Sequence, residues 1–149
     1  MPIDLRDCVQ CRCLAARRTA RAITRHFEAG LRPHGLRATQ FSILAALALG
    51  RPKPLGQLAD FLGLERTTLT RAVELMARNG WVRDGRSADA RARPLRLTAV
   101  GRRKLVTAYP AWKAAQDSAA RRWPHVLNER TGGISHGKQV EQARGEARA

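Results

Sequence analysis

The sequence predicts a mainly α-helical domain that carries one small β-hairpin. Apolar residues recur at helical spacing in five segments between residues 16 and 123. Two short segments, residues 81–85 and 94–98, instead alternate apolar and polar side chains as strands do. The chain has 149 residues, which is enough for one domain with a buried core and too few for two typical domains.

Two helices are expected in the first 50 residues. The first runs from about residue 16 to the segment RPHG, residues 32–35, where proline and glycine interrupt it. Its apolar face consists of Ala20, Ile23, Phe27 and Leu31. The second helix is expected to begin at Thr39, whose hydroxyl can cap the first turn, and to end at Gly50. Its buried stripe is expected to consist of Phe41, Leu44, Ala45 and Ala48.

Two more helices, the hairpin and a last long helix follow. A short third helix has an apolar face made of Leu55, Leu58, Ala59 and Leu62. The fourth extends from Arg66 to Asn79, because Asn79-Gly80 is a typical helix stop. The two strands are joined by the basic loop RSADARAR, and Thr98 is expected to cap a fifth helix that ends near Pro124. Three consecutive helices followed by a basic two-stranded hairpin are typical of a winged helix-turn-helix.

The fourth helix has the composition of a DNA-recognition helix. Leu69, Val73 and Met76 share one face and are expected to hold the helix to the core. Threonine methyl groups can contact thymine methyl groups, and arginine can bind guanine O6 and N7 together. The side chains left to face the major groove are Arg66, Thr67, Thr68, Thr70 and Arg71. In the alternative interpretation, the two adjacent threonines only cap and fill the first helical turn.

The charge of the chain favours an anionic polymer as the partner. The net charge is +16, and 24 of the 28 basic residues are arginine, whose planar guanidinium suits phosphates and guanine edges. In the hairpin loop, Arg86, Arg91 and Arg93 are suited to phosphates or to a flanking minor groove. The alternative is a solvated basic surface without a specific partner.

The joint pattern resembles the MarR family of bacterial transcriptional regulators. The resemblance rests mainly on residues 55–105, LGQLADFLGLERTTLTRAVELMARNGWVRDGRSADARARPLRLTAVGRRKL. This segment is similar to the family pattern LA-x-x-LG-(L/V)-x-x-(S/T)-T-(L/V)-(S/T)-R, which precedes the hairpin. Asp89 and Arg91 match the D-x-R of the wing, and Thr98 with Gly101 matches the closing T-x-x-G. Residues 32–47, RPHGLRATQFSILAAL, resemble the segment before the helix-turn-helix, and the whole resemblance covers roughly residues 16–123.

The resemblance implies a winged helix-turn-helix with an α-helical dimerisation region built from the first and last helices. It implies a homodimer on double-stranded DNA, in which two recognition helices enter successive major grooves of a pseudo-palindromic operator. It also implies a small-molecule effector, although the sequence does not assign the residues of a ligand pocket. Three features depart from the family pattern: Pro54 replaces the usual Ser or Thr cap, the wing is unusually rich in arginine, and the chain after Pro124 lacks an apolar final helix.

All three cysteines lie in the segment DCVQCRC, residues 7–13. Cys8, Cys11 and Cys13 could ligate zinc or an iron–sulfur cluster from a loop, leaving one ligand position to a partner protomer, a histidine or an exogenous group. A second interpretation is a thiol switch in which neighbouring cationic side chains favour the reactive thiolate. These side chains are Arg6, Arg12 and Arg17. The third interpretation gives the cysteines no role.

These observations predict a dimeric, sequence-specific DNA-binding regulator, acting as a repressor, that responds to a small ligand or to a metal, iron–sulfur or thiol redox signal at the cysteines. An iron–sulfur or thiol redox protein and a non-specific architectural DNA binder are the two alternatives. The chain lacks a catalytic constellation, so an enzyme is not expected. It also lacks an apolar run of about 18 residues and a signal segment, so it is expected to be cytoplasmic, with no membrane partner.

Three regions are expected along the chain. Residues 1–15 form a cysteine-containing segment, and residues 16–127 form the winged helix-turn-helix with its dimerisation helices. Residues 128–149 have only two large aliphatic side chains and are expected to form a disordered tail.

Overall fold

The computed structural model describes residues 5–50, 54–85 and 94–126, which form a mainly helical fold with a two-stranded hairpin. Short 3-10 helices are labelled η. In chain order the elements are η1 (Leu5–Gln10), α1 (Arg12–Leu31), η2 (Arg32–His34), α2 (Ala38–Ala48), α3 (Leu55–Leu62), α4 (Arg66–Arg78), β1 (Val82–Asp84), β2 (Leu95–Leu97) and α5 (Ala99–Arg122). The predicted order of helices and strands is therefore confirmed.

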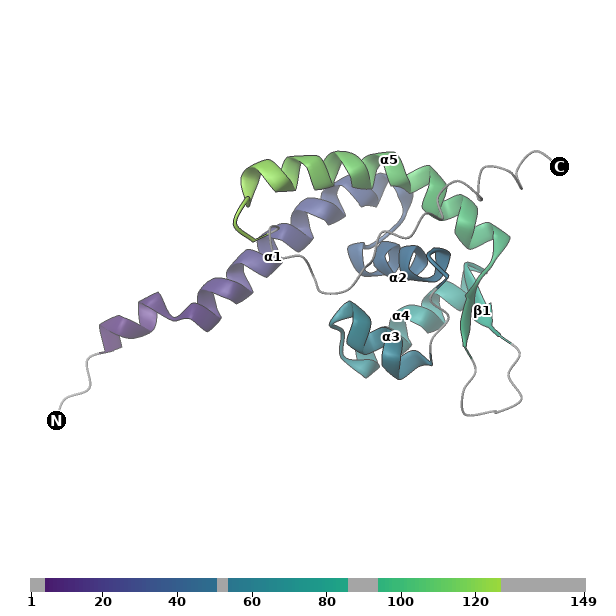
Figure 1. The fold of residues 1–149 in the computed structure, drawn as a ribbon, viewed down its shortest axis with the longest axis horizontal. Helices are drawn as coiled ribbons and strands as arrows, with labels where there is room; N and C mark the ends of the chain where they lie inside the picture. The colour runs from purple at the N-terminus through teal and green to yellow at the C-terminus, as the bar shows by residue number, and fades with distance from the viewer. Residues whose placement is uncertain (1–4, 51–53, 86–93, 127–149) are drawn as a thin grey trace.

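The elements are arranged in layers with α2 in the middle (Figure 1). On one side of α2, α5 packs against the second half of α1, whereas η1 and the first half of α1 extend beyond the body of the molecule. On the other side lie α3 and α4, which contact each other, with the hairpin next to α4. The helix-turn-helix thus lies on the side of α2 opposite α5, and the hairpin runs beside it from the start of α5.

The core is centred on α2. Ile43 and Leu44 are fully buried, and apolar side chains from α3, α4 and both strands pack around them. These side chains are Leu58, Leu69, Met76, Val82 and Leu95. The ring of Phe41 stacks on Trp112 of α5, with centroids 5.3 Å apart. Because α2 contacts both layers, it connects the α1–α5 pair to the helix-turn-helix.

The predicted start of α2 was wrong by two residues. The N-cap is Arg37, and its backbone N–H donates to the Gln40 side-chain oxygen at 2.9 Å, which closes the first turn without Thr39. The predicted buried stripe was also incomplete, because α2 is covered on more than one side. Ile43, Ala46 and Leu47 are buried along with Phe41 and Leu44, while the predicted Ala45 and Ala48 are only half-buried.

The first helix begins earlier than its apolar pattern predicts. α1 starts at Arg12 with Cys11 as N-cap, although Ala20 and nearly all residues before it are exposed. Arginine, alanine and leucine are strong helix formers, so this arm can be helical without a buried face. The apolar pattern follows burial instead: Ile23 and Phe27 are half-buried, and Leu31 is buried where α1 meets the core.

The hairpin leads directly into α5 through Thr98. The strands are antiparallel, with Val82 opposite Leu97, Arg83 opposite Arg96 and Asp84 opposite Leu95. As predicted, Thr98 is the N-cap of α5, and its hydroxyl oxygen accepts from the Gly101 N–H at 3.0 Å. The same hydroxyl lies 3.0 Å from the Trp81 carbonyl oxygen, to which it can donate. The T-x-x-G motif therefore joins the base of the hairpin to the first turn of α5.

Candidate nucleic-acid interface

The two faces of α4 differ sharply in burial. Leu69 and Met76 are fully buried, and Val73 is half-buried, as the sequence predicts. On the other side, Arg66, Thr67, Thr68 and Arg71 are exposed, while Thr70 is half-buried. An amphipathic helix of this kind is held by one face and leaves the other free to contact a partner.

The two adjacent threonines of α4 do not cap the helix. The N-cap is Glu65, and it makes no side-chain capping hydrogen bond. Thr70 differs from them, because its hydroxyl donates to the Arg66 carbonyl oxygen at 2.9 Å. The Thr70 hydroxyl is therefore already used within the helix, whereas Thr67 and Thr68 lie on the exposed first turn.

A tight turn sets the position of α4 relative to α3. The C-cap of α3 is Gly63, which has a left-handed conformation with φ of +62°. The Leu64 N–H donates to the Ala59 carbonyl oxygen at 2.9 Å. Glycine adopts this conformation without strain, so the chain can reverse within two residues. Leu58 and Ala59 of α3 are buried against the core that also holds Leu69 of α4.

The base of the wing carries two arginines that the sequence analysis did not select. Arg83 and Arg96 lie directly opposite each other on the two strands, and both are exposed. They line a cavity of about 350 Å³ with Asp84 and Gly85. Their strand alternation, with buried Val82 and Leu95 as neighbours, was the signal that could have identified them. The predicted wing residues Arg86, Asp89, Arg91 and Arg93 lie outside the described residues.

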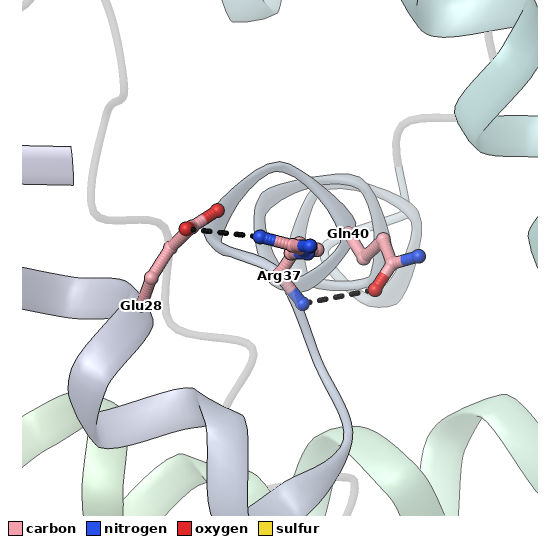
Figure 2. Close-up of polar contacts among 3 residues, drawn as sticks. All are labelled: Glu28, Arg37 and Gln40. Carbon is pink, nitrogen blue, oxygen red and sulfur yellow. Dashed lines mark hydrogen bonds and ion pairs between the residues drawn. The ribbon is translucent and has the colours of Figure 1, made fainter. Parts of the chain in front are cut away.

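A cavity with a mixed polar and apolar lining lies where the α1–α5 layer meets the helix-turn-helix. Its volume is about 460 Å³, and its lining includes Glu28 and Arg32 of the α1–η2 region, Arg37 and Gln40 of the start of α2, and Trp81. Figure 2 shows that Arg37 lies between the other two polar side chains. Its guanidinium contacts the Glu28 carboxylate at 3.3 Å, and its backbone N–H donates to Gln40. The Arg37 side chain remains 70% exposed despite this contact.

The three cysteines occupy different local structures. Cys8 lies in η1, Cys11 is the N-cap of α1, and Cys13 lies in the first turn of α1. All three are free and exposed, and the Arg17 guanidinium lies 3.8 Å from the Cys13 sulfur. Across residues 5–50, 54–85 and 94–126, no group of three or more His, Cys, Asp or Glu side chains is arranged to hold a metal ion. Within one chain, the described geometry therefore does not assemble the predicted three-cysteine ligand set.

One negative finding concerns membranes. None of the helices in the described part of the chain combines the length and the apolar character needed to cross a bilayer.

Comparisons with known proteins agree on one family. Residues 34–93 match the model described as "MarR family". The chain is similar to the transcriptional regulator MosR of M. tuberculosis, with 40% identity over 78% of this chain and 87% of that chain and a TM-score of 0.69. For the structure of MosR in complex with DNA, identity is 38% over 93% of this chain and 99% of that chain, with a TM-score of 0.71.

A curated relative is more distant. It is an uncharacterized HTH-type transcriptional regulator, YwoH, of Bacillus subtilis (strain 168), and it is 30% identical over 86 residues. The match covers 58% of this chain and spans 63% of the length of that relative.

Proposed function

The chain belongs to the MarR family of transcriptional regulators, and we propose from this membership that it is a homodimeric repressor that binds a specific DNA sequence. The family consists of regulators and not of enzymes. The relative solved with DNA supports double-stranded DNA as the partner of this chain. Residues 16–127 are proposed to form the reader with its dimerisation helices, residues 1–15 the sensor segment and residues 128–149 a tail.

The observation that carries the proposal is the exposed face of α4. Leu69 and Met76 are apolar because they pack into the core. Packing does not explain why arginines and threonines occupy the opposite side of the helix. In a helix-turn-helix, this side of the second helix enters the major groove with its N-terminal residues near base edges. The proposed reading residues are Arg66, Thr67, Thr68, Thr70 and Arg71.

The wing is proposed to contact DNA beside the major groove. Arg86, Arg91 and Arg93 would bind phosphates or the flanking minor groove, and Asp89 would orient Arg91. Two copies of this unit, related by two-fold symmetry, would bind half-sites about 34–36 Å apart on a pseudo-palindrome.

The direct test is selection of duplexes from a random pool, followed by competition. A sequence-specific regulator enriches a pseudo-palindrome and holds it against excess random DNA, because base contacts add to the salt-dependent backbone term. If no site is enriched and all duplexes compete equally, the chain is an architectural DNA binder and the proposal fails.

The signal is proposed to act on the cysteines by thiol oxidation. Two thiols and one hydrogen peroxide would give one disulfide and two water molecules, so the two electrons pass from sulfur to the peroxide. The Arg17 guanidinium 3.8 Å from the Cys13 sulfur and the exposure of all three cysteines support this chemistry. A zinc or iron–sulfur site is the competing signal, and it would need ligands from a second protomer.

A small-molecule effector is a second candidate, because the 460 Å³ cavity is lined both by Arg37, whose side chain is 70% exposed, and by Trp81. This lining suits a small aromatic carboxylate. Salicylate as the probe should raise the thermal midpoint of the wild type and not of Arg37→Ala. If both proteins respond equally, the cavity is not the site.

A further inference from the structure

Arg66, the first residue of α4, lies against the first turn of α3. A Cβ atom built on Gly56 of α3 would stand 2.5 Å from the Arg66 Nη2 atom, 3.2 Å from its Cζ and 3.3 Å from its Nε. These distances are too short for ordinary contacts, so the guanidinium occupies this place only because residue 56 has no side chain. Gly56 and Arg66 are ten residues apart, and no local sequence pattern connects them.

The contact is not explained by the stability of the free protein. In the part of the chain that the structure describes, the Arg66 side chain makes no hydrogen bond or ion pair. Its neighbour, the beginning of α3, is the positive end of a helix, where a cation is not stabilised. Glycine itself is unfavourable within a helix compared with alanine. Local features that work against stability are expected where a position serves binding.

The location of the guanidinium indicates what it would bind. In a helix-turn-helix on DNA, the first helix crosses the phosphate backbone and only the second enters the groove. A side chain of α4 that lies on α3 is therefore at the backbone side of the interface. Thr67, Thr68 and Arg71 are also exposed and remain available for base edges.

On the basis of the proposed function, we infer that Arg66 binds a DNA phosphate rather than a base, and that Gly56 is the positioning residue that holds it there. This differs from the assignment of Arg66 to base reading. The Arg66 contact would add affinity for any sequence, while discrimination would come from the remaining exposed residues of α4.

The test compares wild type, Gly56→Ala, Arg66→Ala and the double variant on a selected duplex and a random duplex over a range of salt concentrations. Each single variant should weaken binding to both duplexes by about tenfold, as expected for loss of a charge-assisted contact. The slope of log affinity against log salt should flatten by about 0.9 for each recognition helix on the DNA. The double variant should bind no more weakly than Arg66→Ala, because alanine at residue 56 acts only through the arginine.

Two controls separate this effect from general ones. Gly30→Ala changes a helical glycine whose Cβ would meet only ordinary contacts of 3.6 and 3.7 Å, and Arg78→Ala removes an exposed charge at the far end of α4. Both should bind DNA like the wild type.

Gly56→Ala should melt at or above the wild-type temperature, since alanine favours the helix and the end of the Arg66 side chain can move away. Arg66→Gln provides a second variant that loses the charge without any change at Gly56.

Two outcomes would overturn the inference. A loss confined to the selected duplex would assign Arg66 to a base edge. Wild-type binding by Gly56→Ala beside weak binding by Arg66→Ala would show that the glycine does not position the arginine. Failure of the proposed function is a different result, in which the wild type prefers no duplex at all, and the salt slopes would still test Arg66 on random DNA.

Discussion

Arg71 is the residue of α4 best placed to read a base. It lies one helical turn after Thr67 and Thr68, so the three side chains share the exposed face. Arg71→Ala should cost about 1–3 kcal/mol on the selected duplex and little on random DNA, because a bidentate contact to guanine is specific for the base. Fluorescence anisotropy with both duplexes measures the difference, with Arg78→Ala as the matched control. An equal loss on both duplexes would make Arg71 a phosphate contact.

Gly101, the glycine of the T-x-x-G motif, lies where a side chain has no room. A Cβ atom there would overlap the Trp81 carbonyl oxygen and would stand 2.8 Å from the Leu97 Cδ1 atom. The first contact is with backbone, which cannot move aside without opening the junction of the hairpin and α5. We predict that Gly101→Ala lowers the free energy of unfolding by about 1–3 kcal/mol, as overpacked positions do.

Chemical denaturation followed by tryptophan fluorescence measures this loss. Gly30→Ala is again the control, because both are helical glycines and only one has no room for a methyl group. If the two variants are equally stable, the close approach of Trp81 to Gly101 is not a constraint on the fold.

At the scale of elements, sequence periodicity was sufficient where an element buries one face. α3, α4 and both strands do so: Leu58 and Leu69 are buried as predicted, and the strands bury Val82 and Leu95. Periodicity failed for α2, which is covered on several sides, and capping chemistry failed at its start. Thr39 was a reasonable cap from composition, but the Gln40 side chain closes the turn from within the helix.

Features that join distant parts of the chain could not be predicted. The contact of Arg66 with Gly56 and the cavity around Arg37 depend on how α1, α2, α3 and α4 pack, which no local spacing reveals. The exposed face of α4 was predictable because it is the complement of a buried stripe on the same helix. Whether a side chain on that face would contact a base or a phosphate depends instead on its contacts with other helices, as for Arg66 against α3.

The wing is the second element with a distinct prediction. Its basic residues are expected to contact phosphates or a narrow minor groove, which depends mainly on charge. Arg91→Ala and Arg93→Ala should therefore weaken binding to selected and random duplexes by similar factors and flatten the salt dependence by about 0.9 for each wing on the DNA. Anisotropy titrations at several salt concentrations measure both effects. An unchanged slope would remove the wing arginines from the interface.

At the scale of the whole molecule, the cysteine-containing segment lies at the far end of α1, away from α3, α4 and the hairpin. η1 and the exposed half of α1 carry the cysteines, and the other half of α1 packs on α5. Glu28 of α1 contacts Arg37 at the start of α2, and Phe41 of α2 stacks on Trp112 of α5. α1 therefore contacts α2, the helix that supports α3 and α4, so a shift of α1 can be passed to them. In a homodimer such a shift would alter the distance between the two copies of α4.

The last prediction tests whether this arrangement transmits a thiol signal. Replacing Cys8, Cys11 and Cys13 together by serine should leave the fold intact, because all three are exposed and precede the buried part of α1. Hydrogen peroxide should weaken DNA binding by the wild type by about 5–150-fold, the usual range of coupling between two sites. The triple-serine variant should not respond, and a thiol reductant should restore binding by the wild type.

Parallel titrations after treatment with a chelator distinguish the competing signal. The response would then be lost on metal removal, and protein purified without oxygen would absorb visible light above about 400 nm. These two results together would assign the signal to an iron–sulfur cluster and not to a disulfide. Cys13→Ser alone should abolish most of the response if the thiol beside Arg17 is the one that reacts first, since the thiolate is the nucleophile. Identical DNA binding by wild type and triple-serine protein in every condition, without bound metal, would leave the N-terminal cysteines with no part in regulation.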